Sequence, residues 1–106
     1  MADPVASLLQ QAEPLASLSI SHLTPASRRK LAEGQLSVHS YPNEYGGFVY
    51  VGVRGDNLPD ETDLLAIFDV AIRADLIWLK FDADAAVIDG LPVFVIEDRQ
   101  AVDDED

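Results

Sequence analysis

The sequence lacks cysteine altogether, and basic residues, tryptophan and long apolar runs are scarce. Without cysteine the chain has no disulfide framework, iron–sulfur cluster, thiolate zinc site or cysteine nucleophile, and a reducing compartment is permitted. No apolar run approaches the roughly 18 residues of a membrane helix, and the N-terminal residues lack the basic start and apolar stretch of a secretory signal. We therefore expect a cytoplasmic protein without a membrane anchor.

The scarcity of basic residues produces a strong negative charge. Seven lysines and arginines stand against nineteen aspartates and glutamates, so the formal net charge is -12. Residues 54–106 hold fifteen of these nineteen acids but only four of the basic residues. Such a field repels phosphate backbones and anionic membranes, so we expect neither direct nucleic-acid binding nor membrane binding. A basic protein surface is the natural partner, although acidity can also serve only to keep a small protein soluble.

The length and the hydrophobic periodicity predict one α+β domain over residues 1–97. Helices are expected at residues 3–14, 24–34 and 60–75, and strands at 17–23, 36–41, 48–53, 76–81 and 92–96. These elements predict about five strands in a largely antiparallel sheet packed with about three helices, with room for one parallel crossover through the third helix. The strand at 48–53 is apolar at nearly every position, which favours cover on both faces. Residues 98–106 are predicted to form an acidic mobile tail.

Three aspartates, Asp82, Asp84 and Asp89, lie in the stretch WLKFDADAAVIDGLPVF. A calcium loop starting at Asp82 fails, because its fifth, sixth and twelfth positions hold apolar residues. A weaker magnesium site at Asp82 and Asp84 leaves open the alternative of a small metal-dependent hydrolase. The simpler interpretation is that Asp82 and Asp84 end a strand and Asp89 begins a turn with Gly90. Their carboxylates then face outward, toward a cationic partner.

The other motifs carry little catalytic signal. His22 and His39 lie in or beside predicted strands without a nucleophile-elbow pattern, and no glycine-rich loop opens a helix where it would bind phosphate. The basic run SRRK at residues 27–30 is explained by a solvated helix end. We therefore expect no enzyme, no cofactor and no resident metal.

Aromatic residues gather in the stretch YPNEYGGFVY around a predicted hairpin. Tyr41, Tyr45, Phe48 and Tyr50 concentrate aromatic area there. Tyrosine is favoured at protein interfaces, which makes Tyr41 and Tyr45 candidate contacts. Cross-strand packing that only stabilises the hairpin is an equally good explanation.

The segments SISHLTPASRRKL, YPNEYGGFVYV and WLKFDADAAVIDGLPVF together resemble a small bacterial domain family of unknown function, which is met in phage, plasmid and genomic-island proteins. The resemblance covers about Ser17 to Val95 and leaves the first helix and the acidic tail outside. It implies an accessory protein of a mobile element and supplies no catalytic residue.

These observations favour a non-enzymatic, acidic binding or regulatory protein that engages a basic protein surface. That partner can be a nucleic-acid-binding protein, if the carboxylates imitate DNA phosphates. The alternatives are the hydrolase at Asp82 and Asp84, and a self-associating structural module, monomer or homodimer, joined through an edge strand or the aromatic hairpin. The candidate partner-binding residues are Asp60, Glu61, Asp63, Asp82, Asp84, Asp89, Tyr41 and Tyr45.

Overall fold

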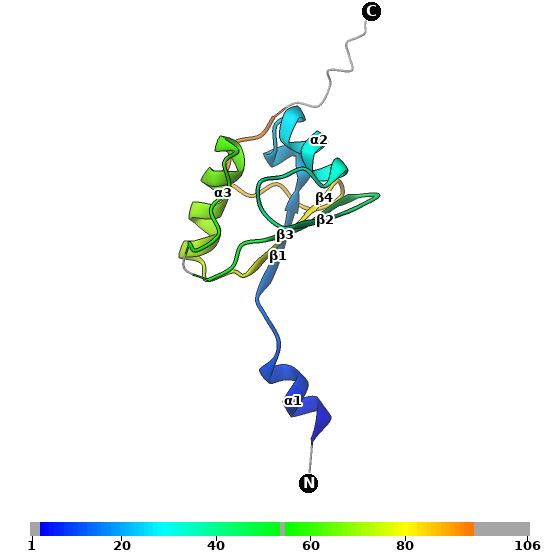
Figure 1. Ribbon diagram of the computed structural model, residues 1–106, viewed down its shortest axis with the longest axis vertical. Helices are drawn as coiled ribbons and strands as arrows, with labels where there is room; N and C mark the ends of the chain where they lie inside the picture. The colour runs from blue at the N-terminus through cyan, green and yellow to red at the C-terminus, as the bar shows by residue number, and fades with distance from the viewer. Residues whose placement is uncertain (1–2, 54, 95–106) are drawn as a thin grey trace, which may run out of the picture.

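The computed structural model describes residues 3–53 and 55–94, which form an α+β fold with three α-helices and one mixed sheet (Figure 1). The elements in chain order are α1 (Pro4–Gln10), β1 (Leu15–Ser19), the 3-10 turn η1 (Ile20–His22), α2 (Pro25–Glu33), β2 (Ser40–Asn43), β3 (Gly46–Tyr50), α3 (Thr62–Arg73) and β4 (Trp78–Asp82). The predicted α+β class is confirmed. The predicted acidic tail, residues 98–106, lies outside the described residues.

The ends of the first two α-helices follow from local side-chain chemistry. The Asp3 carboxylate accepts the backbone N–H of Val5 at 3.1 Å and caps α1. The Thr24 hydroxyl accepts the backbone N–H of Ser27 at 3.2 Å and caps α2 in the same way. Each cap is followed by proline, which has no N–H to leave unpaired in the first turn. Gly34 ends α2 with a left-handed φ of +68°, which glycine adopts without strain.

The sheet has four strands in the order β1-β4-β3-β2. β1 and β4 are parallel, whereas β4–β3 and β3–β2 are antiparallel. The expected crossover through the third helix is therefore wrong: α3 connects β3 to an antiparallel neighbour. The parallel partner of β4 is instead β1, whose pairing continues backward through the Pro14 carbonyl, which accepts the N–H groups of Ile77 and Trp78 at 3.0 and 3.2 Å.

The expected fifth strand at 92–96 is absent from its described part, Pro92–Phe94. The polar groups of this segment bond to η1 and α2 and not to a strand. The backbone N–H of Phe94 donates to the Ser21 carbonyl at 2.7 Å, and the Phe94 carbonyl accepts Arg28 Nη2 at 2.6 Å. The segment thus has the composition of a strand, but its described backbone forms these bonds and no strand ladder.

The predicted hairpin is present, but its first strand begins late. β2 and β3 pair with Tyr41 opposite Phe48, and Glu44 and Tyr45 form the loop between them. Leu36 and Val38, expected in the strand, lie before it in irregular backbone and are buried. The alternation of apolar and polar residues over 36–39 reflects this burial: Leu36 and Val38 point into the core, and Ser37 and His39 point away from it.

One face of the sheet and two helices form the hydrophobic core. The sheet contributes Leu18, Val49, Leu79 and Phe81, which alternate with outward-facing residues along their strands. The remaining buried apolar residues come from α2, α3 and the connecting segments: Leu23, Leu31, Leu36, Val38, Val51, Leu64, Ile67, Phe68 and Ala71. Since α2 and α3 both contribute to this cluster, they pack on the same face of the sheet.

The first helix does not take part in this packing. α1 has no buried residue, and it projects away from the sheet at the N-terminal end (Figure 1). Its apolar side chains Val5, Leu8 and Leu9 are 68%, 72% and 69% exposed. The expectation that about three helices pack on the sheet is therefore corrected to two, because the segment before β1 leads α1 away from the core.

Candidate binding face

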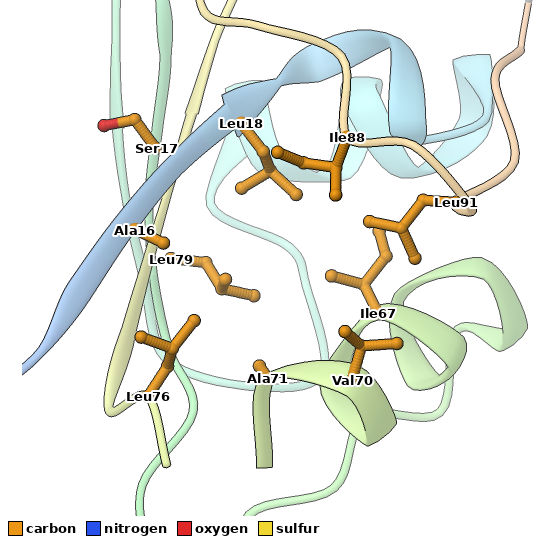
Figure 2. Close-up of a pocket in the computed structure, with 10 residues that line it drawn as sticks. All are labelled: Ala16, Ser17, Leu18, Ile67, Val70, Ala71, Leu76, Leu79, Ile88 and Leu91. Carbon is orange, nitrogen blue, oxygen red and sulfur yellow. The ribbon is translucent and has the colours of Figure 1, made fainter. Parts of the chain in front are cut away.

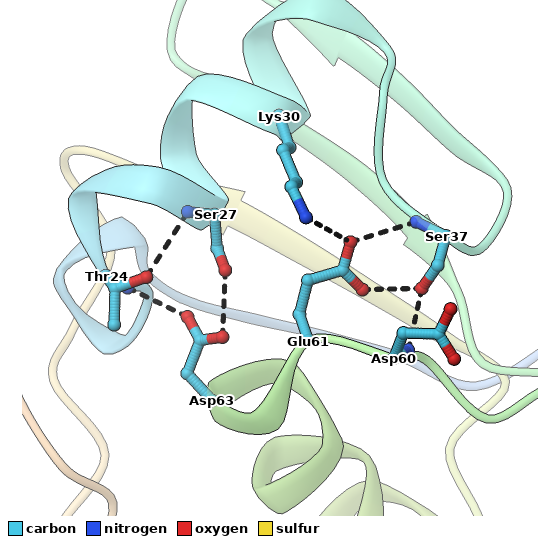
Figure 3. Close-up of polar contacts among 7 residues, drawn as sticks. All are labelled: Thr24, Ser27, Lys30, Ser37, Asp60, Glu61 and Asp63. Carbon is cyan, nitrogen blue, oxygen red and sulfur yellow. Dashed lines mark hydrogen bonds and ion pairs between the residues drawn. The ribbon is translucent and has the colours of Figure 1, made fainter.

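The carboxylates at the start of α3 belong to an internal hydrogen-bond network (Figure 3). Glu61 is buried, with 8% of its surface exposed. Its carboxylate accepts the Ser37 backbone N–H at 3.0 Å and the Ser37 hydroxyl at 2.5 Å, and Lys30 Nζ lies 3.6 Å away. The Ser37 hydroxyl also accepts the backbone N–H of Asp60 at 2.8 Å. Glu61 thereby ties α2 and the segment before β2 to the start of α3.

These hydrogen bonds also set the ionisation of Glu61. Burial on its own raises the pKa of a carboxyl group, because the charged form loses its water. The hydrogen bonds from Ser37 and from the backbone N–H of Glu61 itself, with the Lys30 ammonium nearby, outweigh burial and hold the pKa of Glu61 below its ordinary value of 4.5. Glu61 is therefore ionised at neutral pH, and both of its oxygens are engaged.

Asp63 serves the same purpose two residues further on. One of its oxygens accepts the backbone N–H of Thr24 and the other accepts the hydroxyl of Ser27, each at 2.8 Å (Figure 3). Asp63 thus joins α3 to the start of α2. The carboxylate oxygens of Glu61 and Asp63 accept hydrogen bonds from other residues of the domain. We therefore do not place these two residues on a partner-binding surface. Asp60 is exposed and stays a predicted contact.

Asp82 and Asp84 form a turn at the end of β4. One oxygen of Asp82 accepts the backbone N–H of Asp84 at 2.8 Å, and the other lies 3.8 Å from Lys80 Nζ. The backbone N–H of Ala83 donates to the Tyr45 carbonyl at 2.9 Å, which fixes the β2–β3 loop beside this turn. The structure therefore brings together three of the predicted contacts, Asp82, Asp84 and Tyr45, at one end of the sheet.

A metal site gains no support from this geometry. Within residues 3–53 and 55–94, no three histidine, aspartate or glutamate side chains are grouped so that they could hold a metal ion. Asp89 lies in an exposed turn with Gly90, whose φ is +94°. The hydrolase centred on Asp82 and Asp84 consequently lacks a third ligand among the described residues.

His22 has a structural role. It is 1% exposed, its Nε2 accepts the backbone N–H of Ile88 at 2.9 Å, and its Nδ1 lies 2.7 Å from the Pro92 carbonyl oxygen. The ring is therefore the neutral tautomer with the proton on Nδ1. It fastens the loop after β4 against η1. His39, by contrast, is exposed on the segment that leads into β2.

An apolar pocket lies between the sheet, α3 and the loop after β4, and it is partly open to solvent at Val70 and Ile88 (Figure 2). It measures about 120 Å³, against roughly 300 to 1,000 Å³ for pockets that hold small ligands. Its walls are formed by Ala16, Ser17, Leu18, Ile67, Val70, Ala71, Leu76, Leu79, Ile88 and Leu91. No cluster of polar side chains converges on it, so it offers no catalytic machinery.

Both edge strands limit self-association by strand pairing. β2 contains Pro42, which cannot donate a backbone hydrogen bond. On the opposite edge, the backbone N–H of Ser19 in β1 already donates to the Ala86 carbonyl at 2.9 Å. Such features protect sheet edges from other chains. Association through the aromatic hairpin is unaffected by them and stays a prediction.

The second face of the sheet is open to solvent. The alternation along each strand assigns to it Leu15, Ser17, Tyr41, Asn43, Phe48, Tyr50, Trp78, Lys80 and Asp82, which we call the open face. Of the described helices, α2 and α3 pack on the opposite face and α1 has no buried residue. The expectation that the strand at 48–53 is covered on both faces is therefore wrong, because Phe48 and Tyr50 on β3 are only half-buried.

An aromatic cluster occupies one end of the open face, where β3 ends and β4 begins. Trp78 lies opposite Tyr50 in the β3–β4 pairing, with their ring centroids 5.0 Å apart in an edge-to-face arrangement. The Tyr41 ring lies 6.0 Å from Trp78 and is tilted by 39°. These rings and His39 line a surface hollow of about 200 Å³. Tyr41 is 58% exposed, so the hollow is accessible from solvent.

One carboxylate lies beside this cluster. Trp78 Nε1 donates a hydrogen bond to Glu13 Oε1 at 2.7 Å, across 65 residues of sequence. Asp82 lies on the same face as Trp78, but at the other end of β4. Lys80, the basic residue of the open face, lies 5.9 Å from the Phe48 ring centroid and 3.8 Å from an Asp82 oxygen. The open face thus carries the aromatic cluster and Glu13 at one end and Asp82 at the other.

Trp78 and Glu13 were not among the residues predicted to bind a partner. The signal for Trp78 was present, because the alternation in WLKFD puts Trp78, Lys80 and Asp82 on the face opposite Leu79 and Phe81. No local signal marks Glu13, whose contact depends on the parallel pairing of β1 with β4.

In fold and site, the part of the chain that the structure describes is a small α+β domain in which two helices cover one face of a four-stranded sheet and no described helix covers the other. The chain belongs to the family whose model is described as "Family of unknown function (DUF5983) C-terminal domain", which matches residues 15–95. The match confirms the predicted resemblance to a domain family of unknown function and begins at β1. No curated protein and no solved structure matches the chain. None of the helices in the described residues is long and apolar enough to cross a membrane.

Proposed function

We propose that this protein is a non-enzymatic binding or regulatory module that engages a basic protein surface through its open face. The observation that carries the proposal is the cluster of Trp78, Tyr50 and Tyr41 on a sheet face that no described helix covers. Aromatic area exposed on a rigid sheet is typical of interaction surfaces, because its burial by a partner removes apolar surface from water.

The charge of the chain supports a basic partner. With a net charge of -12 and carboxylates at the margin of the open face, the domain attracts a positively charged surface and repels nucleic acid. Tyrosine and tryptophan supply contact area. The carboxylates raise the rate of association with a basic partner and disfavour acidic ones. Asp82 and Asp84 add acidic groups at the other end of the face, with Tyr45 beside them at the hairpin loop. Asp60, at the start of α3, and Asp89, in the loop after β4, are further acidic contacts that we propose for the same partner.

A sharper form of the proposal is DNA mimicry. The excess of acids in residues 54–106 supports it, because carboxylates arrayed on an exposed surface can occupy a site that normally binds phosphates. The partner is then a nucleic-acid-binding protein, and the chain acts in the cytoplasm as an accessory protein of a mobile element. The resemblance to families met in phages, plasmids and genomic islands is the support for that setting.

We expect affinity capture from the native host to recover a basic protein with the wild-type chain and to lose it with the double variant Asp82→Asn/Asp84→Asn. Both substitutions remove charge at the margin of the open face and keep side-chain size. Raising the salt concentration from about 0.1 M to 1 M shortens the Debye length from about 10 to 3 Å, so recovery should fall steeply over this range. Quantitative mass spectrometry of the eluates measures the loss.

The matched control is Asp69→Asn, which removes a carboxylate that pairs with Arg73 on the exposed side of α3. This variant should retain the partner. Equal recovery with the double variant, or recovery that does not depend on salt, would contradict an electrostatic role for the open face.

A further inference from the structure

We propose that the hollow lined by His39, Tyr41, Tyr50 and Trp78 binds the guanidinium group of an arginine side chain. This inference rests on the proposed function and names the chemical group that the open face recognises on its basic partner. The occupant is thus an arginine of a protein and not a nucleobase or a lysine.

The arrangement of the rings suits a planar cation. Trp78 meets Tyr50 edge to face at 63° and Tyr41 at 39°, so neither pair is a parallel stack. The rings therefore stand at angles around the hollow and do not fill it. A guanidinium group is flat and delocalised, and it stacks on aromatic faces with an attraction that is strongest for tryptophan.

The electrostatics of the hollow also favour a cation that donates several hydrogen bonds. Glu13 uses Oε1 to accept the indole N–H of Trp78 at 2.7 Å. No contact within residues 3–53 and 55–94 engages its second oxygen, Oε2. A guanidinium group stacked on Trp78 can donate to this oxygen, because its N–H groups lie in its own plane and point outward from its edge.

Other occupants satisfy fewer of these groups. A lysine ammonium is a strongly hydrated point charge without a face to stack, so it gains less from the three rings. A nucleobase can stack on the same rings, but its phosphates meet Glu13 in a chain of net charge -12. Of the three, arginine gains most, because it combines stacking on the rings with hydrogen bonds to the carboxylate.

Trp78 is the single tryptophan of the sequence, so its fluorescence reports on the hollow directly. We would titrate the full chain with a peptide of three arginines spaced by glycine, with the same peptide carrying lysines, and with hexameric single-stranded DNA and RNA. We expect the arginine peptide to change the Trp78 emission and to bind roughly fivefold or more tightly than the lysine peptide, with no saturable response to either oligonucleotide.

Two matched pairs of variants test the contacts. Tyr41→Leu removes a ring of the hollow and should weaken arginine-peptide binding by roughly fivefold, whereas Val87→Ala changes an exposed apolar side chain in the loop after β4, outside the hollow, and should leave it unchanged. Glu13→Gln keeps an acceptor for the indole but loses the charge, and should weaken binding severalfold. Glu33→Gln, at the end of α2, should not.

Equal binding of the two peptides, with the same loss on Tyr41→Leu, would overturn the choice of arginine and leave the basic-partner proposal intact. A change in Trp78 emission that Tyr41→Leu and Val87→Ala affect alike would overturn the hollow as the site. Tighter binding of an oligonucleotide than of the arginine peptide would overturn both this inference and the proposed function, as would the absence of any peptide response combined with failed capture of a basic protein.

Discussion

Gly46→Ala is expected to lower the free energy of unfolding by about 3 kcal/mol or more, a large share of the roughly 5 to 15 kcal/mol that stabilises a small protein. Gly46 begins β3 and pairs with Asp82. A Cβ at this position would lie 2.1 Å from the Phe81 carbonyl oxygen and 2.8 Å from its carbonyl carbon. These atoms belong to the backbone of β4, so the two strands must separate to admit the methyl group. The φ of +151° adds strain, because L residues rarely adopt it.

Gly34→Ala provides the matched comparison for this prediction. Gly34 has a φ of +68°, but an added Cβ would meet nothing within 4 Å. Its cost is therefore only the left-handed conformation, about 1 kcal/mol. Urea denaturation followed by Trp78 fluorescence measures both variants. Equal urea midpoints for Gly46→Ala and Gly34→Ala would show that β3 does not approach β4 at Gly46 as described. That result would also contradict the arrangement of strands that forms the open face.

Glu61→Gln is expected to destabilise the domain by about 2 to 3 kcal/mol at neutral pH. Glu61 accepts two hydrogen bonds from Ser37 with different oxygens and lies 3.6 Å from Lys30 Nζ. Glutamine offers one acceptor oxygen and an NH2 group, so one Ser37 donor loses its acceptor and the NH2 group is placed against that donor. The substitution also removes the negative charge of the Glu61 carboxylate that lies beside Lys30.

The effect of Glu61→Gln should also depend on pH. The pKa of Glu61 is lowered in the folded state, so the ionised carboxylate stabilises the fold fully above its unfolded pKa of about 4.5. This contribution is lost as the pH falls through the lowered folded pKa, where the carboxylate takes up a proton. The stability of the wild type should therefore fall more steeply with acid than that of the variant, and the two curves should converge at low pH.

Asp69→Asn is the control for Glu61→Gln. Asp69 pairs with Arg73 at 2.9 Å on the surface of α3, where the two side chains are 68% and 70% exposed. Exposed ion pairs contribute little, so this variant should lose well under 1 kcal/mol. Chemical denaturation between pH 3 and 8 measures all three proteins. A loss at Glu61 no larger than at Asp69 would contradict the network that joins α2 to α3.

The elements that local chemistry specifies were predictable from the sequence. Asp3 and Thr24 before proline, and Gly34 after the basic turn, mark helix ends through bonds with near neighbours. The acidic first turn and apolar face of residues 60–75 predicted α3 in the same way. The turn at Asp82 and Asp84 also formed as expected, because its hydrogen bond spans only two residues.

The features that depend on distant pairing were not predictable. An apolar strand such as β3 has the same composition whether a second layer or an aromatic cluster surrounds it, so the open face was missed. The fifth strand was predicted because residues 92–96 are apolar, yet Phe94 bonds to η1 and α2. The acids of α3 were assigned outward, since nothing in DETD shows that Ser37 and Ser27 lie opposite them.

These differences change which residues are expected to meet a partner. The prediction from charge alone treated the acids of the second half as one surface. The structure separates Glu61 and Asp63, which hold the domain together, from Asp82 and Asp84, which lie at the end of the open face. It also adds Trp78, so the proposed contact surface has the aromatic cluster and Glu13 at one end and Asp82 and Asp84 at the other.

The most direct test of this account is photo-crosslinking in the native host. The crosslinking residue p-benzoylphenylalanine replaces Tyr41 on the open face in one variant, and Ala32 on the exposed side of α2 in another. The account predicts that the probe at position 41 forms an adduct with a basic protein, whereas the probe at position 32 forms none. Adducts with a basic protein from position 32 but not from position 41 would show that the partner binds the helical side, and would contradict the open face as the binding site.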